Sequence, residues 1–313
     1  MFTYDQKGIQ IAGAELWLDA LRKVSFSFVS HGHTDHLKNH TRILATPATA
    51  CFHALRAKKA EVQTLNFGET LEMAGMRIRL YPAGHILGSA MIHIERDGLS
   101  LLYSGDFKLR PSATCEPIET PHADILITES TFGHPQYVVE QSREALIAEL
   151  TGFIRDAQRA GYTPVVMAYT LGKSQEAMKI LGDLGYPVRV YPSIWQMAEV
   201  YQQFGVKFNN CAVWQGAGIG AEEVLIVPPH VAFTRALQFV PRRKTVFLSG
   251  WANGSQGPGW RCDHRIPLSD HADFHELIEF VGRVQPQKIY TTHGFAEFPG
   301  HLCELGYDAE ILA

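Results

Sequence analysis

The chain has 313 residues, 46% hydrophobic and 19% charged, a composition typical of a folded globular protein with an ample core. Its net charge of −4 excludes a global basic field, so binding of a polyanion must be local or metal-assisted. Five scattered cysteines without a Cys-x-x-Cys pair argue against a disulfide framework and for reduced thiols in a cytoplasmic protein. No stretch approaches the roughly 20 apolar residues of a membrane span, so we expect no contact with a membrane.

A short predicted strand within residues 9–19 ends at Asp19. Two interpretations of this aspartate stay open. It is either a cap or turn residue, or a carboxylate that orients a metal ligand or an attacking water.

The next predicted strand, residues 24–30, leads into His31-Gly32-His33-Thr34-Asp35-His36. Imidazole and carboxylate groups together suit zinc and its first-row neighbours. In a loop, the first two histidines can face one ion, and the final Asp-His pair can face another. The alternative is a polar turn with a helix cap, although three protonated histidines in such a turn would repel one another.

Four later strands also deliver side chains with metal-binding or acid–base chemistry. They are His85 after strand 76–81, Asp106 after strand 99–103, Glu129 in strand 123–131 and His293 in strand 288–294. Strand ends of this kind predict one catalytic edge of a sheet, with loops completing the site. Taken alone, His85 is equally well explained as a polar loop residue. His93, in an alternating strand, is predicted to face outward.

The middle of the chain has a different pattern of predicted strands and helices. A helix is expected at 139–160, followed by alternating strands and helices over 164–204 and by strands at 224–227 and 245–248. This alternation predicts a mostly parallel sheet. The block has a single histidine, His230, and almost no ligand chemistry. We therefore expect residues 136–254 to form a domain inserted into another, discontinuous domain of residues 1–135 and 255–313.

Ligand chemistry resumes at His271, directly before a predicted helix with an apolar face from Phe274. Residues 269–273 supply candidate helix caps, and His271 is itself open to that interpretation.

The ordered series His31-x-His33-x-Asp35-His36, His85, Asp106 and His293 resembles the metallo-β-lactamase superfamily. That resemblance implies an α/β fold, an αββα sandwich of two mixed sheets with a dinuclear metal site at one edge. A narrower resemblance rests on Glu129 in Thr-Glu-Ser-Thr, His271 in Ser-Asp-His-Ala-Asp and His293 in Thr-His-Gly. These look like motifs A, B and C of the β-CASP nucleases, which include RNase J, the mRNA 3′-end-processing endonuclease and Artemis-like DNA nucleases. The inserted block then looks like the β-CASP domain.

The resemblance also implies roles for the residues of the site. One divalent ion is expected on His31, His33 and His85, a second on Asp35, His36 and His293, with Asp106 bridging the two. Zinc is expected, with manganese as an alternative activating ion. The catalytic residues that the resemblance implies are Asp35, Asp19, His271 and Glu129. Asp19 would orient the hydroxide or a ligand imidazole. His271 would contact the scissile phosphate and protonate the leaving oxygen, and Glu129 would fix the tautomer of His271.

Two departures from the Artemis-like pattern affect which end of a strand, 5′ or 3′, the enzyme is expected to attack. His293 is present, as in RNase J, and Asp273 stands where Artemis-like enzymes tend to place serine. A 5′-phosphate pocket of the Artemis type is therefore not carried over. We expect nucleic-acid contacts from Lys108, Lys173 and Tyr169, because they flank the motifs.

The expected activity is a single-strand DNA exonuclease in repair, with endonuclease activity as a possible addition. The chain looks most like the compact bacterial ligase-associated exonucleases, so a DNA ligase is an expected partner. An RNA nuclease of the RNase J type is the alternative. A non-catalytic scaffold and a small-molecule hydrolase are less favoured, because the ligand set is complete and an insert is present.

Overall fold

The computed structural model describes residues 1–57, 59–253, 259 and 261–313. The chain divides into two compact units: Met1–Pro135 with His271–Ala313 form the first, and Gln136–Asp270 forms the second. The junction expected at 254/255 lies outside the described residues. Strand β17 (His264–Ile266) pairs with a strand of the second unit, so the boundary between the compact units falls later, after Asp270.

The first unit contains a six-stranded sheet in the order β1-β2-β3-β4-β5-β6. Its strands are β1 (Phe2–Asp5), β2 (Gly8–Ile11), β3 (Leu16–Leu18), β4 (Phe26–Phe28), β5 (Arg42–Ala45) and β6 (Glu61–Thr64). The first three strands are antiparallel, and β3 to β6 run parallel. The single strand predicted within residues 9–19 is therefore two strands, β2 and β3.

The second sheet of this unit has seven strands in the order β19-β18-β11-β10-β9-β8-β7. They are β7 (Thr70–Met73), β8 (Met76–Pro82), β9 (Ala90–Arg96), β10 (Leu99–Tyr103), β11 (Ile125–Ser130), β18 (Lys288–Gly294) and β19 (Ala309–Ile311). Strands β7 to β10 are antiparallel, whereas β10, β11, β18 and β19 are parallel. Both sheets are therefore mixed.

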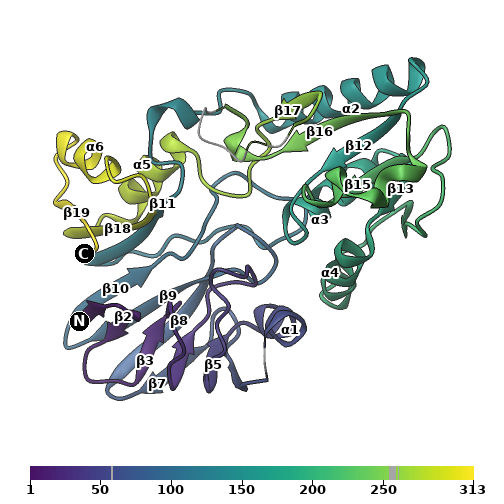
Figure 1. Cartoon of the computed structure of the whole chain (residues 1–313). Helices are drawn as coiled ribbons and strands as arrows, with labels where there is room; N and C mark the ends of the chain where they lie inside the picture. Colours follow the sequence, from purple (N-terminus) through teal and green to yellow (C-terminus); the bar gives the residue numbers. More distant parts are fainter. Residues whose placement is uncertain (58, 254–258, 260) are drawn as a thin grey trace. The chain divides into compact units, whose positions relative to one another are not determined.

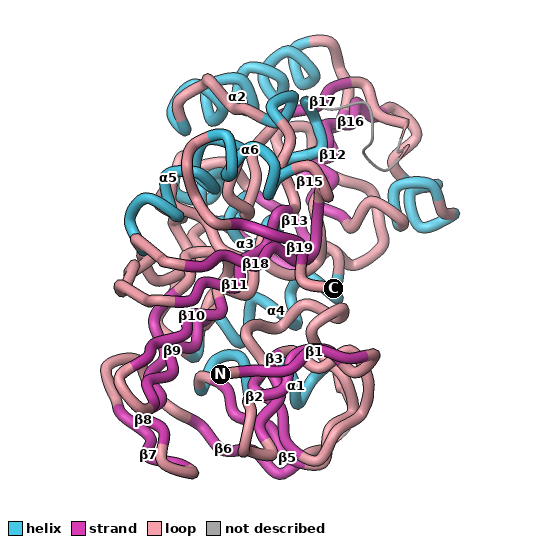
Figure 2. Tube along the Cα trace, turned by 90° about the vertical axis from the view of Figure 1, so that its left-hand side faces the viewer, coloured by secondary structure: helices cyan, strands magenta, loops and turns pink. Residues whose placement is uncertain are grey.

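One apolar core joins the two sheets. Phe26 and Phe28 of the first sheet belong to the same buried cluster as Ile92, Leu101 and Ile127 of the second. Figures 1 and 2 show the two sheets as separate layers, with β3 and β5 in one and β8 to β11 in the other. Burial of these side chains on both inner faces supplies most of the driving force for folding of this unit.

Three helices cover the outer faces of the first unit. They are α1 (Pro47–Arg56), α5 (Phe274–Val284) and α6 (Phe298–Glu304). Helix α1 packs beside β6, and α6 packs beside β18 and β19. The Phe280 ring of α5 lies 4.0 Å from that of Phe107, which follows β10. This is the predicted αββα sandwich.

The second unit is built on a six-stranded sheet in the order β14-β13-β15-β12-β16-β17, and every pairing in it is parallel. The strands are β12 (Thr163–Met167), β13 (Val188–Val190), β14 (Cys211–Val213), β15 (Val224–Val227), β16 (Arg243–Leu248) and β17. Its helices are α2 (Arg143–Arg159), α3 (Lys173–Asp183) and α4 (Pro192–Gln203), with 3₁₀ turns η1 (Pro135–Tyr137), η2 (Val231–Phe233), η3 (Arg235–Phe239) and η4 (Gly250–Asn253) at or between them. The parallel sheet predicted for this block is confirmed.

Within the described part of the chain, no helix is long and apolar enough to cross a membrane.

Candidate functional site

The parallel strands of the second sheet bring three of the predicted side chains to one edge. In the register of β10 and β11, Tyr103 pairs with Ile127, and in that of β11 and β18, Glu129 pairs with Thr292. The carboxyl ends of these strands therefore lie together, as parallel pairing requires. Asp106 follows β10, and Glu129 and His293 belong to the ends of β11 and β18.

Glycine allows the loop after β10 to approach the histidine loop after β4. Gly105 has a φ of +52°, and a Cβ added to it would lie 2.7 Å from the Cβ of Ser30. A backbone hydrogen bond also joins the two sheets here: Ala90 N donates to the carbonyl oxygen of Ser30 (2.9 Å). A larger residue at position 105 would therefore push Asp106 away from His31.

Three imidazoles converge beside Asp106. His33 Nδ1 lies 3.1 Å from His31 Nε2 and 3.0 Å from His85 Nε2. Together with Asp106, these histidines can each offer one ligand atom, and the four atoms all lie within 4.8 Å of one another. Three nitrogens on a tetrahedral zinc ion, at about 2.0–2.1 Å from it, lie about 3.3 Å apart, so the observed donor set fits a divalent metal.

The protonation state of His31 also suits a ligand. The side chain is completely buried. Burial, with a smaller contribution from the neighbouring His36, holds the pKa of His31 well below its usual value. The imidazole is therefore neutral at pH 7, which is the form that binds metals.

A single oxygen of Asp106 faces four imidazoles of the first unit. Asp106 Oδ2 lies 3.5 Å from both His31 Nε2 and His36 Nε2, and 3.9 Å from both His85 Nε2 and His271 Nδ1. Burial alone would raise the pKa of this carboxyl, but His36 and His271 outweigh that effect and hold it well below its usual range. Asp106 is therefore ionised and central to the cluster, as the bridging position requires.

The second predicted ligand group is less closely gathered. His36 Nε2 lies 3.7 Å from Asp35 Oδ2, and the His36 and His293 rings lie 5.5 Å apart. His293 is exposed and has a φ of +50°. Among the described residues, Asp35, His36 and His293 do not form a group as close as that of His31, His33, His85 and Asp106.

Asp19 is buried and serves as an acceptor for the residues that carry the histidines. Its Oδ1 accepts a hydrogen bond from Ser30 N (2.8 Å). Its Oδ2 accepts from Ser30 Oγ (2.5 Å), His36 Nδ1 (2.8 Å) and Tyr103 OH (2.9 Å). Ser30 Oγ also lies 2.9 Å from His31 Nδ1. Of the two interpretations of Asp19, the geometry favours the carboxylate that orients ligand imidazoles.

The environment of His36 follows from this arrangement. Burial of His36 lowers its pKa, but the Asp106 and Asp19 carboxylates on its two sides raise it well above the usual value. One ring nitrogen is fixed by Asp19, so the other, Nε2, faces Asp106. A hydrogen bond from the distal nitrogen of a ligand to a carboxylate is the usual way in which proteins fix its tautomer.

His271 lies beside the metal-competent group and is held by Glu129. His271 Nδ1 lies 3.1 Å from Glu129 Oε2 and 3.3 Å from Glu129 Oε1, and Oε1 also accepts a hydrogen bond from Phe107 N (2.7 Å). Glu129 is 1% exposed, whereas the His271 side chain is 20% exposed. The His271 and His85 rings lie 4.6 Å apart. A partly accessible imidazole oriented by a buried carboxylate can exchange a proton with a bound substrate.

Asp273 has a structural role instead. It is the N-cap of α5, where its side chain accepts a hydrogen bond from Glu276 N (3.0 Å) and forms a capping box. Its other oxygen accepts from the Arg110 guanidinium (3.1 Å). The helix cap expected within residues 269–273 is therefore Asp273 rather than His271.

The predicted nucleic-acid contacts differ in accessibility. Lys173 is 1% exposed and its Nζ lies 2.9 Å from Glu176 Oε2, so its burial does not favour direct contact with a phosphate. Lys173 does flank the motif, but its ammonium is paired with a carboxylate inside the second unit. Lys108 is also buried, at 5% exposed, whereas Tyr169 is 41% exposed.

Sequence reasoning did not identify Ser30 or Tyr103 as parts of the site. Both are buried and both donate to Asp19. The available signal was position: Ser30 directly precedes the histidine loop, and Tyr103 ends the strand before Asp106. Hydroxyl groups at such strand ends are too common to have been selected from the sequence alone.

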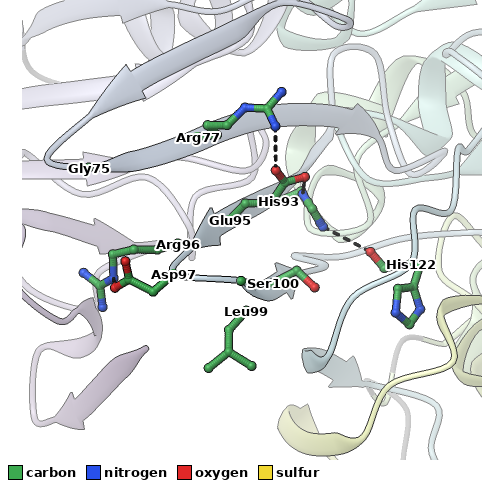
Figure 3. A pocket seen from close by; sticks show the side chains of 10 residues that line it. Gly75, Arg77, His93, Glu95, Arg96, Asp97, Leu99, Ser100 and His122 are labelled. Carbon is green, nitrogen blue, oxygen red and sulfur yellow. Dashed lines mark hydrogen bonds and ion pairs between the residues drawn. The ribbon is translucent and has the colours of Figure 1, made fainter.

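A cavity of about 460 Å³ lies elsewhere in the first unit and includes Arg77, His93, Glu95, Ser100 and His122 in its lining. Figure 3 shows the Arg77–Glu95 ion pair and the contact of His93 Nε2 with the carbonyl oxygen of His122 (3.1 Å). His93 lies on the face of β9 opposite to Ile92 and Ile94, which pack in the core between the sheets, so it faces outward as predicted, but it is covered and only 5% exposed. The cavity lies at the Ser100 end of β10, opposite the end that leads to Asp106.

Comparisons with known proteins relate the chain to nucleic-acid-processing proteins and to a zinc-dependent hydrolase family. Residues 261–307 match a family profile described as "Zn-dependent metallo-hydrolase RNA specificity domain". The chain is 39% identical over 311 residues to a protein of Opitutus terrae named "Probable DNA ligase", covering 96% of this chain and 30% of that protein. It is 29% identical over 347 residues to the "RNase J-like protein" of Methanocaldococcus jannaschii, covering 87% of this chain and 82% of that protein.

A third relative is the "Transcription termination factor FttA" of Pyrococcus abyssi, 26% identical over 299 residues. That alignment covers 74% of this chain and 46% of the relative. The chain thus spans less than half the length of the ligase and of the termination factor.

Proposed function

Because the chain belongs to the β-CASP group of metallo-β-lactamase-fold nucleases, we propose that it is a metal-dependent hydrolase of phosphodiester bonds in nucleic acid. One observation carries this proposal: a single oxygen of Asp106 faces four imidazoles, next to three converging imidazole nitrogens. Such a donor set binds divalent ions, and phosphodiester hydrolysis is chemistry to which bound ions contribute directly.

The residues divide into two sets of ligands for the proposed ions. His31, His33 and His85 would hold one divalent ion, Asp35, His36 and His293 a second, and Asp106 would contact both. Ions held there supply Lewis acidity and lower the pKa of a bound water. Zinc fits the nitrogen-rich set, and manganese is a further candidate for the activating ion.

The chain's own side chains supply orientation and proton transfer. Asp19 holds His36 and, through Ser30, the Nδ1 side of His31, so both imidazoles present Nε2 to Asp106. We assign His271 to the scissile phosphate, where it would donate a proton to the leaving oxygen. Glu129, on Nδ1 of that ring, would stabilise the imidazolium before the proton leaves.

For the substrate, we propose single-stranded DNA, with removal of nucleotides from an end during repair. The support is the relative named "Probable DNA ligase", whose alignment spans nearly the whole chain. A ligase-associated role follows from the same similarity and makes a DNA ligase the proposed partner. RNA is the second candidate, favoured by the RNA specificity profile over residues 261–307 and by the RNase J-like relative.

The test uses matched single strands of DNA and RNA with the same base sequence and a 5′ label. Protein freed of metal and reloaded with zinc or manganese is expected to shorten the DNA strand progressively. Faster cleavage of RNA would assign the chain to the RNase J-like alternative. Hydrolysis of an aryl phosphodiester without cleavage of either strand would indicate a small-molecule hydrolase. No hydrolysis of any substrate, with metal bound, would indicate a scaffold. His36→Ala serves as the inactive control.

A further inference from the structure

A long segment of the second unit has no acidic side chain. Residues 224–262 contain neither Asp nor Glu but include Arg235, Arg242, Arg243, Lys244 and Arg261. At the chain's average of 32 acidic residues in 313, a stretch of 39 residues would carry four. Since the whole chain has a net charge of −4, positive charge is concentrated here. A local surface of this kind attracts polyanions that the chain as a whole would not.

The same segment exposes two phenylalanines. In the turns η2 and η3, Val231 and Leu237 are 3% and 0% exposed and belong to the core of the second unit. Phe233 and Phe239, from the same turns, are 52% and 57% exposed. Burying either ring against a ligand would be favourable by about 1.5–3 kcal/mol, so these rings can contribute to binding.

The turns that carry these rings are anchored to the sheet. Thr234 caps η3, with its Oγ1 accepting from Ala236 N (3.2 Å) and donating to the Val231 carbonyl (2.9 Å). Arg243, in β16, donates to the carbonyls of Leu237 (3.3 Å) and Val240 (2.9 Å). The rings therefore stand on a preformed support, which lowers the entropic cost of binding a ligand.

The cations of the segment are not equally accessible to a ligand. Lys244 is ion-paired with Asp263 (3.0 Å), and Arg243 is occupied by the two carbonyls. Arg242 is exposed but its guanidinium stands over the Tyr162 ring, 5.4 Å from the centroid, whereas Arg235 is exposed and lies between the two phenylalanines in the sequence. Exposed aromatic rings interleaved with arginines combine base stacking with phosphate pairing.

We propose that Phe233, Arg235 and Phe239, here called the aromatic–basic surface, bind a single strand of nucleic acid. This inference rests on the proposed function, which makes nucleic acid the substrate. Bases would stack on the phenyl rings, and the Arg235 guanidinium would pair with a phosphate. A duplex does not present the faces of its bases, and an acidic peptide has none, so a single strand fits best.

The experiment measures fluorescence anisotropy of a labelled 15-nucleotide oligothymidylate on metal-free protein, so that no cleavage occurs. The double variant Phe233→Ala/Phe239→Ala is expected to bind at least roughly tenfold more weakly, since each stacked base contributes strongly to affinity. Arg235→Ala should also weaken binding and reduce the slope of log affinity against log salt by about 0.7, one phosphate contact on a single strand.

An abasic oligomer of the same length separates stacking from charge. The phenylalanine variant should bind the abasic strand as wild type does, whereas Arg235→Ala should bind it more weakly. Phe204→Ala is the matched control, because Phe204 is 41% exposed in the same unit and outside the segment. Phe233→Leu/Phe239→Leu keeps apolar side chains without rings, so a purely structural role would be rescued by it and stacking would not.

The proposal is overturned if the double alanine variant retains wild-type affinity, if Phe204→Ala weakens binding equally, or if the leucine variant restores affinity. Thermal melts of each variant exclude loss of folding. Failure of the proposed function looks different: wild-type protein reloaded with metal would leave both oligonucleotides and an aryl phosphodiester intact, a measurement that does not involve the aromatic–basic surface.

Discussion

Asp19 and His293 both adopt positive φ angles, +40° and +50°, although neither is a glycine. Such backbone conformations cost of order 1–3 kcal/mol and persist where the surroundings hold them in place. At Asp19, four hydrogen bonds from Ser30, His36 and Tyr103 supply that restraint. At His293, Thr292 Oγ1 lies 3.1 Å from the ring Nδ1. The other described non-glycine residues with positive φ, Ala74, Asp97, Asn210 and Gln285, lie in turns or at a helix end, where such a conformation is common.

Asp19→Asn tests whether this carboxylate orients the ligands. The amide keeps the size of the side chain but has one acceptor oxygen for the donors that two carboxylate oxygens now serve. We expect metal affinity or turnover to fall by roughly 10–100-fold, the usual effect of losing a carboxylate behind a ligand imidazole. Isothermal titration with zinc and initial rates measure the two quantities. Wild-type values for both would refute the assignment, and Tyr103→Phe, which removes one donor, should have a smaller effect.

His271→Ala tests the proposed proton donor. His271 is not among the seven proposed ligands, so the metal content should be unchanged while turnover falls by roughly 10²–10⁴-fold. An aryl phosphodiester, whose leaving oxygen needs no proton, should recover most of that rate. Loss of a metal ion on substitution would make His271 a ligand. An equal loss on both substrates would indicate a phosphate contact without proton donation.

At the scale of elements, helix α5 connects the site to the core. Asp273 caps this helix two residues after His271, and the same carboxylate accepts from Arg110, four residues after Asp106. The cap therefore links the segments that carry His271 and Asp106.

Asp273→Ala should lower the free energy of unfolding of the first unit by about 2 kcal/mol, since it removes both the cap and the partner of Arg110. Asp273→Asn is the matched control, because asparagine caps helices as well as aspartate does but has no charge for an ion pair with the guanidinium. It should lose about half as much. Thermal melts followed by circular dichroism measure both. Equal losses would show that the helix cap contributes nothing, and no loss for Asp273→Asn would show that the ion pair contributes nothing.

The loop after β10 allows a second matched comparison. Gly98 and Gly105 both have positive φ, but a Cβ at Gly98 would meet no atom within 4 Å, whereas one at Gly105 would lie 2.7 Å from Ser30. Gly98→Ala should cost about 1–2 kcal/mol from backbone strain alone. Gly105→Ala should cost more and should also weaken metal binding by displacing Asp106. Equal melts with unchanged zinc affinity would contradict this account.

Many elements were predictable because their patterns are local. The strand over residues 76–81, the helix over residues 139–160 and the parallel sheet of the second unit follow from residue spacing, and the candidate ligands follow from strand ends. The burial of Lys173 and His93 was not predictable, because it depends on packing partners distant in the sequence, such as the carbonyl of His122. The same holds for Ser30 and Tyr103, whose common partner is Asp19.

At the scale of the whole molecule, the two compact units carry different candidate functional residues. The proposed ligands and His271 all belong to the first unit, whereas the acid-free segment of residues 224–262 belongs to the second. The first unit is continuous in space but not in sequence. The boundary after Asp270 could not be read from composition, because β17 extends the sheet of the second unit beyond the predicted end of the insert. We propose that the second unit is the β-CASP domain.

The central claim, that the histidine–aspartate cluster is the metal centre of a nuclease, is tested most directly by a metal titration. Protein stripped with a chelator is mixed with increasing equivalents of zinc or manganese, and the rate of shortening of a labelled single DNA strand is measured at each step. The account predicts no cleavage without metal, a rise to a plateau at two equivalents per chain, and no cleavage at any ratio for His36→Ala. Full activity in the metal-free protein, or a plateau at one equivalent, would contradict it.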